Sequence, residues 1–185
     1  GGTDNWAVYH GELVKDKWLK LNTTDASATD TVMWNDTTPT SSVFSVGTYT
    51  NSNGNTNGML AYCFAEKQGY SKFGSYEGNG NADGTYVHLG FRPAFIMIKK
   101  SSGTEDWSMY DAKRNVNGTT NTLPLLANFS DGETGLTGKN MDILSNGVKM
   151  LTSNGELNLS GATYIYMAFA ESPFVNSNGV PNNAR

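Results

Sequence analysis

Residues that could support catalysis or bind a metal are few in this sequence and lie far apart. His10 and His88 have no second ligand at metal-binding spacing, so each is predicted to be a surface or hydrogen-bonded histidine. Cys63 is the single cysteine and lies in an apolar stretch, where a buried and unreactive thiol is expected. The chain carries no GxSxG, HExxH or phosphate-binding glycine motif. These observations predict a protein that is not an enzyme and that binds neither a metal ion nor a cofactor.

Four charged residues could still be assigned a role. Glu66 and Glu171 resemble a glycoside-hydrolase carboxylate pair in type, but each follows an apolar stretch of similar sequence. Equivalent positions predict equivalent local roles, so each is expected to be a structural carboxylate at the end of a strand. Asp111 and Arg114 are predicted to form a local ion pair, which at an exposed position contributes under about 1 kcal/mol.

The stretch from Asn79 to Gly84 has oxygen-bearing side chains at alternate positions followed by glycine, as in the first half of a calcium loop. The twelfth position of such a loop is a bidentate glutamate, and here it is Gly90. An Asx-rich connection is therefore the favoured interpretation, and no calcium site is predicted.

The best candidate for ligand binding is the stretch 69–76, which carries Tyr70, Phe73 and Tyr76 between small and polar residues. On a loop, such rings could stack on sugars or pack against a partner subunit. The alternative is that the three rings fold back onto the sheet.

Composition indicates which elements must position these residues. The chain has 185 residues, 21 of them glycine, and only 16% are charged, which suits short strands joined by tight turns. The aromatic content of 11% is too high for disorder. A net charge of −4 without a basic stripe argues against nucleic acid as a partner. No signal peptide and no apolar run of membrane length is present, so membrane insertion is not predicted.

The longest apolar run of β-forming residues is Ala94–Ile98, preceded by Pro93 and followed by two lysines. Because it does not alternate with polar residues, it is predicted to be a central strand buried on both faces. Asn146-Gly147 is predicted to be a tight turn, and the polar tail 176–185 is predicted to lie along the surface or to fray. Further strands are predicted at 6–9, 18–21, 43–46, 59–65, 107–110, 123–127, 148–151 and 164–170.

The sequence also contains an internal duplication. Three short stretches recur in the same order at offsets of 101, 104 and 105 residues, and the drift falls where turn residues cluster. The matched pairs are 5–9 with 106–110, 43–46 with 147–150, and 60–66 with 165–171.

We therefore expect an all-β, antiparallel β-sandwich built from two tandem, sequence-related repeats. The first repeat spans 1–84 and the second spans 85–185, and the two are either separate or merged into one sandwich. The first repeat lacks a counterpart of the strand 91–100. Either the chain is a piece of a longer protein or another segment fills that place, since an empty place would leave a sheet edge unpaired.

Several of these stretches resemble one known family: 90–99, the pattern from Trp107 to Arg114, 61–80 and 166–171. They are similar to a repeated domain of unknown function in structural proteins of tailed bacteriophages, especially phages of marine bacteria. The ending 178–185 resembles the natural C-termini of such proteins. The resemblance implies a virion component such as a tail fibre, and it supplies no catalytic residues.

The leading functional expectation is a non-enzymatic virion fibre or adhesin domain, extracellular and tail-associated. It would form a homo-oligomer, with a trimer expected, contact other virion proteins and present loops to a host surface glycan. A purely structural role in capsid decoration or tail assembly is the alternative, and a glycan-degrading enzyme is a third.

Overall fold

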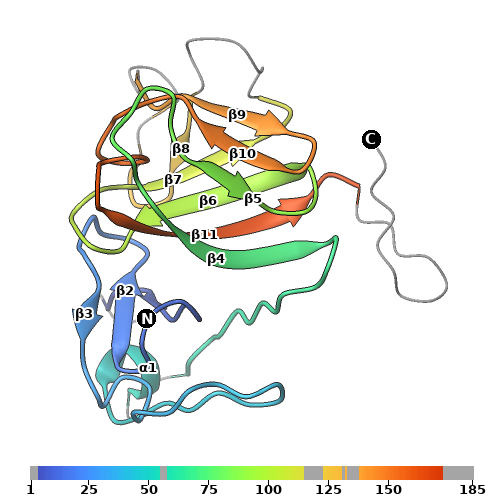
Figure 1. Cartoon of the computed structure of the whole chain (residues 1–185). Helices are drawn as coiled ribbons and strands as arrows, with labels where there is room; N and C mark the ends of the chain where they lie inside the picture. The colour runs from blue at the N-terminus through green and yellow to red at the C-terminus, as the bar shows by residue number, and fades with distance from the viewer. Residues whose placement is uncertain (1–3, 55–57, 115–122, 131, 133–137, 173–185) are drawn as a thin grey trace, which may run out of the picture.

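The computed structural model describes residues 4–54, 58–114, 123–130, 132 and 138–172. Every strand pairing in this part of the chain is antiparallel, and the one helix, α1 (Thr50–Asn53), is a single turn. The predicted all-β, antiparallel class is confirmed. The strands form three sheets, of which two are stacked face to face and the third lies below them in the view of Figure 1.

The middle layer is a five-stranded sheet in the order β4-β11-β6-β7-β8. Its longest strands, β6 and β11, pair from Tyr164 opposite Lys100 to Phe169 opposite Phe95. The bounds are β4 (Ser71–Glu77), β6 (Pro93–Lys100), β7 (Trp107–Asp111), β8 (Leu125–Leu126) and β11 (Thr163–Ala170).

A three-stranded sheet in the order β5-β10-β9 covers one face of the middle layer. Its strands are β5 (Tyr86–His88), β9 (Met141–Leu144) and β10 (Gly147–Met150). Val148 and Ile143 from this sheet share a core with Ile96, Ile98 and Tyr110 from the five-stranded sheet, and all five are fully buried. Apolar burial between these two sheets supplies the main stabilisation of the fold.

The N-terminal residues form a small module on the other face of the five-stranded sheet. It contains β1 (Ala7–Val8), β2 (Lys17–Lys20), β3 (Ala28–Thr29) and α1. Leu19 of the module is buried with Trp107 and Ile165 of the sheet, and the Trp107 indole N–H donates to the Lys20 carbonyl at 2.9 Å. The buried Lys99 ammonium also donates to the Thr24 carbonyl at 3.2 Å. This module therefore covers part of the outer sheet face.

The predicted central strand is confirmed within β6, which lies between β11 and β7. Burial on both faces is confirmed only in part: Ile96 and Ile98 are fully buried, whereas Phe95 and Met97 are half-buried. The sequence could not show this difference, because the module covers only part of the face on which Phe95 and Met97 lie.

Four predictions about the first half of the chain are wrong. Residues 43–46 and 59–65 are not strands, and their large apolar side chains are exposed. Cys63 is accordingly exposed and not buried. The stretch 69–76 is not a loop, since most of it is β4, paired with β11 over seven residues. The stretch 59–65 has high strand propensity, but a strand also requires a hydrogen-bonded neighbour.

The turn at Asn146-Gly147 is confirmed, with one difference. The two-residue connection between β9 and β10 is Ser145-Asn146, and Gly147 is already in β10. A Cβ at Gly147 would lie 2.2 Å from the carbonyl oxygen of Val87 in β5, so this glycine permits close strand approach. The predicted surface tail, 176–185, lies outside the described residues.

Candidate functional site

Aromatic side chains from three neighbouring strands gather on the outer face of the five-stranded sheet. Phe169 of β11 lies directly opposite Phe95 of β6, and their ring centroids are 6.4 Å apart. Phe73 of β4 lies diagonally across from Phe169, with ring centroids 6.1 Å apart. Side chains alternate between faces along a strand, so these three share the face opposite the main core.

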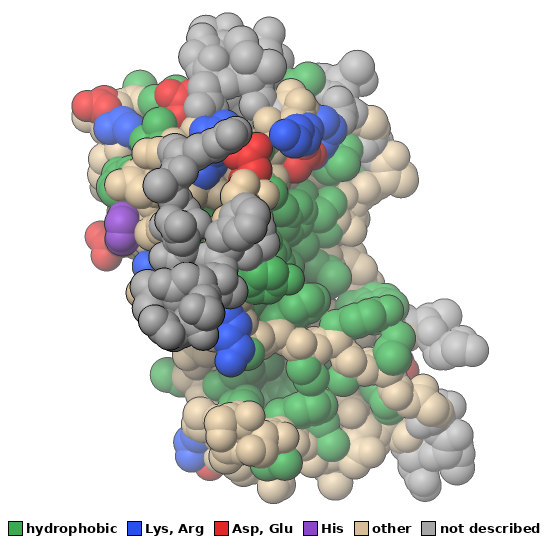
Figure 2. All heavy atoms as spheres, turned by 90° about the vertical axis from the view of Figure 1, so that its right-hand side faces the viewer, with side chains coloured by type: hydrophobic (Ala, Val, Ile, Leu, Met, Phe, Trp, Pro, Cys, Tyr) green, Lys and Arg blue, Asp and Glu red, His purple; other side chains and the backbone are tan. Residues whose placement is uncertain are grey.

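Two further rings come from the chain leading into β4. Phe64 packs edge-on against Phe169 at 5.8 Å, and Tyr70 does so at 6.1 Å. We call the set Phe64, Tyr70, Phe73, Phe95 and Phe169 the aromatic patch. Phe64 and Tyr70 are 59% and 50% exposed, and the other three are partly buried. Figure 2 shows hydrophobic side chains gathered on one side of the molecule.

The three residues singled out from sequence have different positions. Tyr70 and Phe73 belong to the aromatic patch, whereas Tyr76 faces the main core. The Tyr76 ring stacks on Tyr164 at 5.0 Å, and its hydroxyl donates to the Leu157 carbonyl at 2.7 Å. Burial raises the pKa of the Tyr76 hydroxyl well above its usual value. Tyr76 therefore packs against the main core and is not part of the aromatic patch.

Sequence reasoning missed Phe64, Phe95 and Phe169. The last two lie in runs that are apolar at every position, which favoured complete burial. Period-two spacing does place Phe95 and Phe169 on one face, but it cannot tell which part of that face the N-terminal module leaves uncovered.

Ion pairs border the patch near the end of β11. Arg92 contacts the Glu171 carboxylate at 2.9 Å and donates to the Ile143 carbonyl at 2.8 Å, which ties the two sheets together. Lys113 lies 3.3 Å from the same carboxylate. The hydrogen bond from Lys113 and the charge of Arg92 hold the pKa of Glu171 below its ordinary value. Glu171 thus has a structural partner set at the strand end, as predicted.

His10 of the module lies on another side of the patch. Its ring is 6.5 Å from that of Phe73, and its Nε2 is 3.1 Å from the Tyr166 carbonyl oxygen. The Glu12 amide donates to Nδ1, so the proton of the neutral ring is on Nε2, which donates to Tyr166. Burial lowers the pKa of His10, partly offset by the Tyr166 carbonyl and the Glu12 charge. The predicted hydrogen-bonded histidine is confirmed here, and it is buried.

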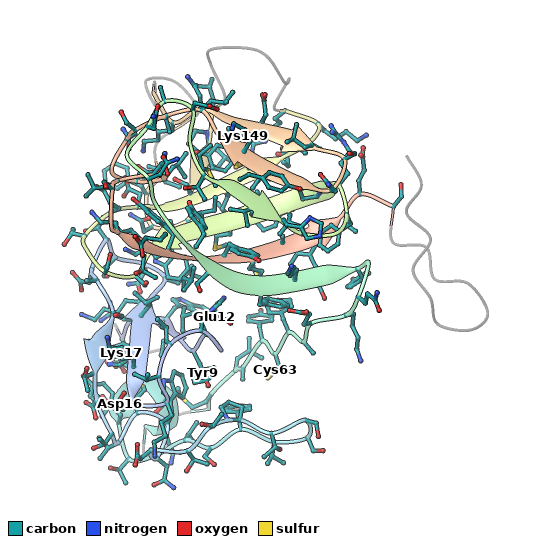
Figure 3. The ribbon with its side chains drawn as sticks, viewed as in Figure 1. Tyr9, Glu12, Asp16, Lys17, Cys63 and Lys149 are labelled. Atoms are coloured by element: carbon teal, nitrogen blue, oxygen red, sulfur yellow. The ribbon has the colours of Figure 1, made fainter. Side chains whose placement is uncertain are left out.

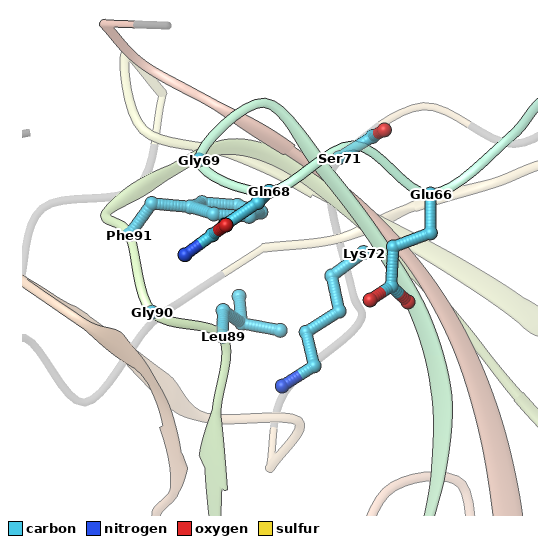
Figure 4. Close-up of a pocket in the computed structure, with 8 residues that line it drawn as sticks. All are labelled: Glu66, Gln68, Gly69, Ser71, Lys72, Leu89, Gly90 and Phe91. Carbon is cyan, nitrogen blue, oxygen red and sulfur yellow. The ribbon is translucent and has the colours of Figure 1, made fainter. Parts of the chain in front are cut away.

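A hollow of about 280 Å³ lies between the beginning of β4 and residues 89–91 (Figure 4). Leu89 and Phe91 line its apolar part, and Glu66 and Lys72 contribute charge. The Lys72 ammonium donates to the His88 carbonyl at 2.8 Å. None of the five patch residues lines the hollow, and Leu89 and Phe91 belong to the main core. Its volume is slightly below the range of typical small-molecule pockets, so the hollow is not part of the candidate site.

Ser108, Glu156 and Lys139 form a polar cluster inside the fold that sequence patterns did not suggest. The Glu156 carboxylate accepts a hydrogen bond from Ser108 and pairs with the Lys139 ammonium. Burial raises the pKa of Glu156, and the hydrogen bond and charge of Lys139 oppose that shift. Ser108 and Glu156 are only 0% and 2% exposed, so no substrate reaches them. The cluster satisfies buried polar groups.

The stretch 79–84 is a run of Asx turns. The Asn79 side chain accepts from the Asn81 amide at 2.9 Å, and the Asn81 side chain accepts from the Asp83 amide at 3.1 Å. The Asp83 carboxylate pairs with Lys149 at 2.6 Å. These oxygens therefore have partners within the protein, as expected of a structural connection. Asp111 and Arg114 form the predicted ion pair.

The fold and the patch define an all-β domain with an exposed aromatic surface. One family model matches residues 1–173, and the chain belongs to that family, described as a domain of unknown function (DUF7483). No curated protein and no solved structure matches the chain. In the part of the chain that the structure describes, no helix has the length and apolarity to cross a membrane.

Proposed function

We propose that this chain is a non-enzymatic binding domain of a bacteriophage fibre that contacts host surface glycans through the aromatic patch. The exposure of Phe64 and Tyr70 beside Phe169 is the observation that carries the proposal. Aromatic faces stack on the apolar faces of sugar rings, and the hydroxyl of Tyr70 offers a polar contact at the rim. The resemblance to phage structural proteins supports the virion context, and the domain is extracellular and tail-associated in this proposal.

The same proposal includes the assembly state and the origin of the fold. The domain works as a homo-oligomer, most simply a trimer, attached to other virion proteins and not to nucleic acid or membrane. The fold derives from two tandem, sequence-related repeats merged into one sandwich. Support for merging comes from β4, which lies in the first repeat by sequence but pairs with β11 of the second.

The test is a glycan array that includes envelope polysaccharides of marine bacteria. The native domain is expected to bind at least one polysaccharide, and Tyr70→Ala is expected to weaken binding about tenfold. Tyr86→Ala is the matched control, because Tyr86 is 42% exposed on β5 and outside the patch. Equal effects of both variants would contradict the assignment of the patch. Release of reducing ends from a bound polysaccharide would instead establish a glycan-degrading enzyme.

A second candidate function is structural, through protein contacts in capsid decoration or tail assembly. The exposed apolar side chains of Met59 and Leu60, 51% and 67% exposed, favour it. Absence of glycan binding together with tight association to a virion protein, weakened by Tyr70→Ala, would support this function over the first.

A further inference from the structure

The strongest unassigned feature is the stretch 59–65, which we call the 59–65 segment. Every residue in it is exposed, although it carries the apolar side chains of Met59, Leu60, Tyr62 and Phe64. Figure 1 shows it running between α1 and β4, outside all three sheets, and Figure 3 shows Cys63 on it. Exposed apolar residues in such number usually mark a contact with another chain.

The backbone of the segment makes almost no hydrogen bonds to the described residues. Among the described residues, the N–H and C=O groups of 59–64 make no hydrogen bond, and only the Ala65 carbonyl accepts one, from Ser71 at 2.8 Å. A β-prone stretch with free backbone groups can accept an added strand.

Two ring contacts of the segment have the two-residue spacing of a strand. Tyr62 stacks on Trp6 at 6.4 Å, and Phe64 contacts Phe73 at 6.5 Å and Phe169 at 5.8 Å. Residues 62 and 64 therefore face the protein together, as residues two apart do in a strand. In that geometry the backbone groups point sideways, where a neighbouring strand would lie.

The internal duplication indicates which kind of strand fits. Residues 60–66 match 165–171, and 165–170 belong to β11, which pairs antiparallel with β6. We infer that the 59–65 segment is the acceptor for a strand of β6-like sequence, which adds to it antiparallel. In the matching register, Phe64 lies opposite the residue equivalent to Phe95, and Tyr62 lies opposite the equivalent of Met97.

The chain's own β6 cannot be this strand, because it is held between β11 and β7. The added strand therefore comes from elsewhere in the assembly, as a segment with the sequence character of Phe91–Lys100: apolar at consecutive positions, with proline at its start and lysines at its end. This inference does not depend on glycan binding by the aromatic patch.

A fluorescent peptide with the sequence of residues 90–101 tests the inference. Anisotropy is expected to show saturable binding to the folded protein, and hydrogen exchange is expected to show new amide protection at 59–65. The control is the same peptide with proline at the positions of Ile96 and Met97, which removes two backbone donors. It is expected to bind at least about tenfold more weakly.

The matched protein variant is Cys63→Pro. Because no backbone hydrogen bond of the described residues involves Cys63, the variant is expected to keep the native melting temperature while losing at least about tenfold in peptide affinity. Protection at β4, an edge strand of the five-stranded sheet, in place of 59–65 would overturn the inference. The inference would also be overturned if the peptide did not bind. The same holds if the protein formed concentration-dependent dimers through two 59–65 segments and the peptide did not dissociate them.

Discussion

At the scale of single residues, the same residue type has opposite roles in this protein depending on the side of the sheet it occupies. Tyr76 and Tyr70 are six positions apart, yet the first is hydrogen-bonded within the core and the second is half exposed beside Phe169. Two further residues affect the stability of the fold through their surroundings: His10 through its protonation and Gly147 through its lack of a side chain.

His10 is expected to make stability depend on pH in the weakly acidic range. Its pKa in the folded protein is below the ordinary value of 6.5, so the unfolded chain takes up the proton first as the pH falls. The contribution is complete above about pH 6.5 and is lost as the pH drops from there through the folded-state pKa. The free energy of unfolding, measured by urea denaturation from about pH 7.5 to about pH 5.5, should therefore decrease.

The variant His10→Gln separates the contribution of His10 to this pH dependence from the contributions of other titratable groups. Its amide can still donate to the Tyr166 carbonyl but does not titrate, so it should flatten the decrease. An unaltered slope in His10→Gln would contradict the assignment.

Gly147 is expected to tolerate no side chain. Gly147→Ala forces a Cβ to within 2.2 Å of the Val87 carbonyl oxygen, so the free energy of unfolding should fall by about 2 kcal/mol or more. Gly11→Ala is the matched control, because no atom lies within 4 Å of its added Cβ, and it should change stability by less than about 0.5 kcal/mol. Thermal unfolding of both variants provides the measurement.

At the scale of elements, the two tryptophans at matched positions of the duplication have different environments. Trp107 in β7 is 5% exposed and donates to the Lys20 carbonyl, whereas Trp6 beside β1 is 54% exposed and stacks on Tyr62. Equivalent sequence has therefore produced a buried strand residue in one case and a surface residue in the other.

This difference predicts that replacing each tryptophan by phenylalanine destabilises the protein by unequal amounts. Trp107→Phe removes the indole donor, leaves the Lys20 carbonyl without that partner and opens space, and should cost about 2–3 kcal/mol. Trp6→Phe should cost less than about 0.5 kcal/mol. Chemical denaturation of the two variants tests this, and similar losses would show that both tryptophans support the fold equally.

At the scale of the whole molecule, two layers cover the five-stranded sheet, one on each face. The larger core lies on the side of β5, β9 and β10, and the smaller contact with the N-terminal module is centred on Leu19, Trp107 and Ile165. The module should therefore detach more easily than the sandwich-like pair of sheets unfolds.

Leu19→Ala tests this order of stability. Truncation of this fully buried leucine should lower the free energy of unfolding by about 3 kcal/mol. The substitution should mainly weaken the packing of the module on the five-stranded sheet. Hydrogen exchange is expected to accelerate in β1 and β2 while β9 and β10 keep their protection. Val14→Ala, at a position 60% exposed, is the control. Equal acceleration in all sheets would show that module and sheets unfold as one unit.

The sequence by itself determined the antiparallel all-β class, the central strand at Ala94–Ile98 and the turn before Gly147. These depend on local properties, namely β-forming residues in apolar runs and turn-forming residues between them. The sequence matches at offsets of 101, 104 and 105 residues were also visible without a structure, and so was the lack of a known catalytic motif.

Only the tertiary structure decided which strand-like stretches became strands and which apolar face remained open. Residues 59–65 and 165–170 have similar sequences, yet in the described part of the chain only the second has a neighbouring strand that supplies backbone hydrogen bonds. The patch around Phe169 likewise depends on where the N-terminal module ends. Both outcomes depend on contacts between residues far apart in the chain, and local sequence does not specify such contacts.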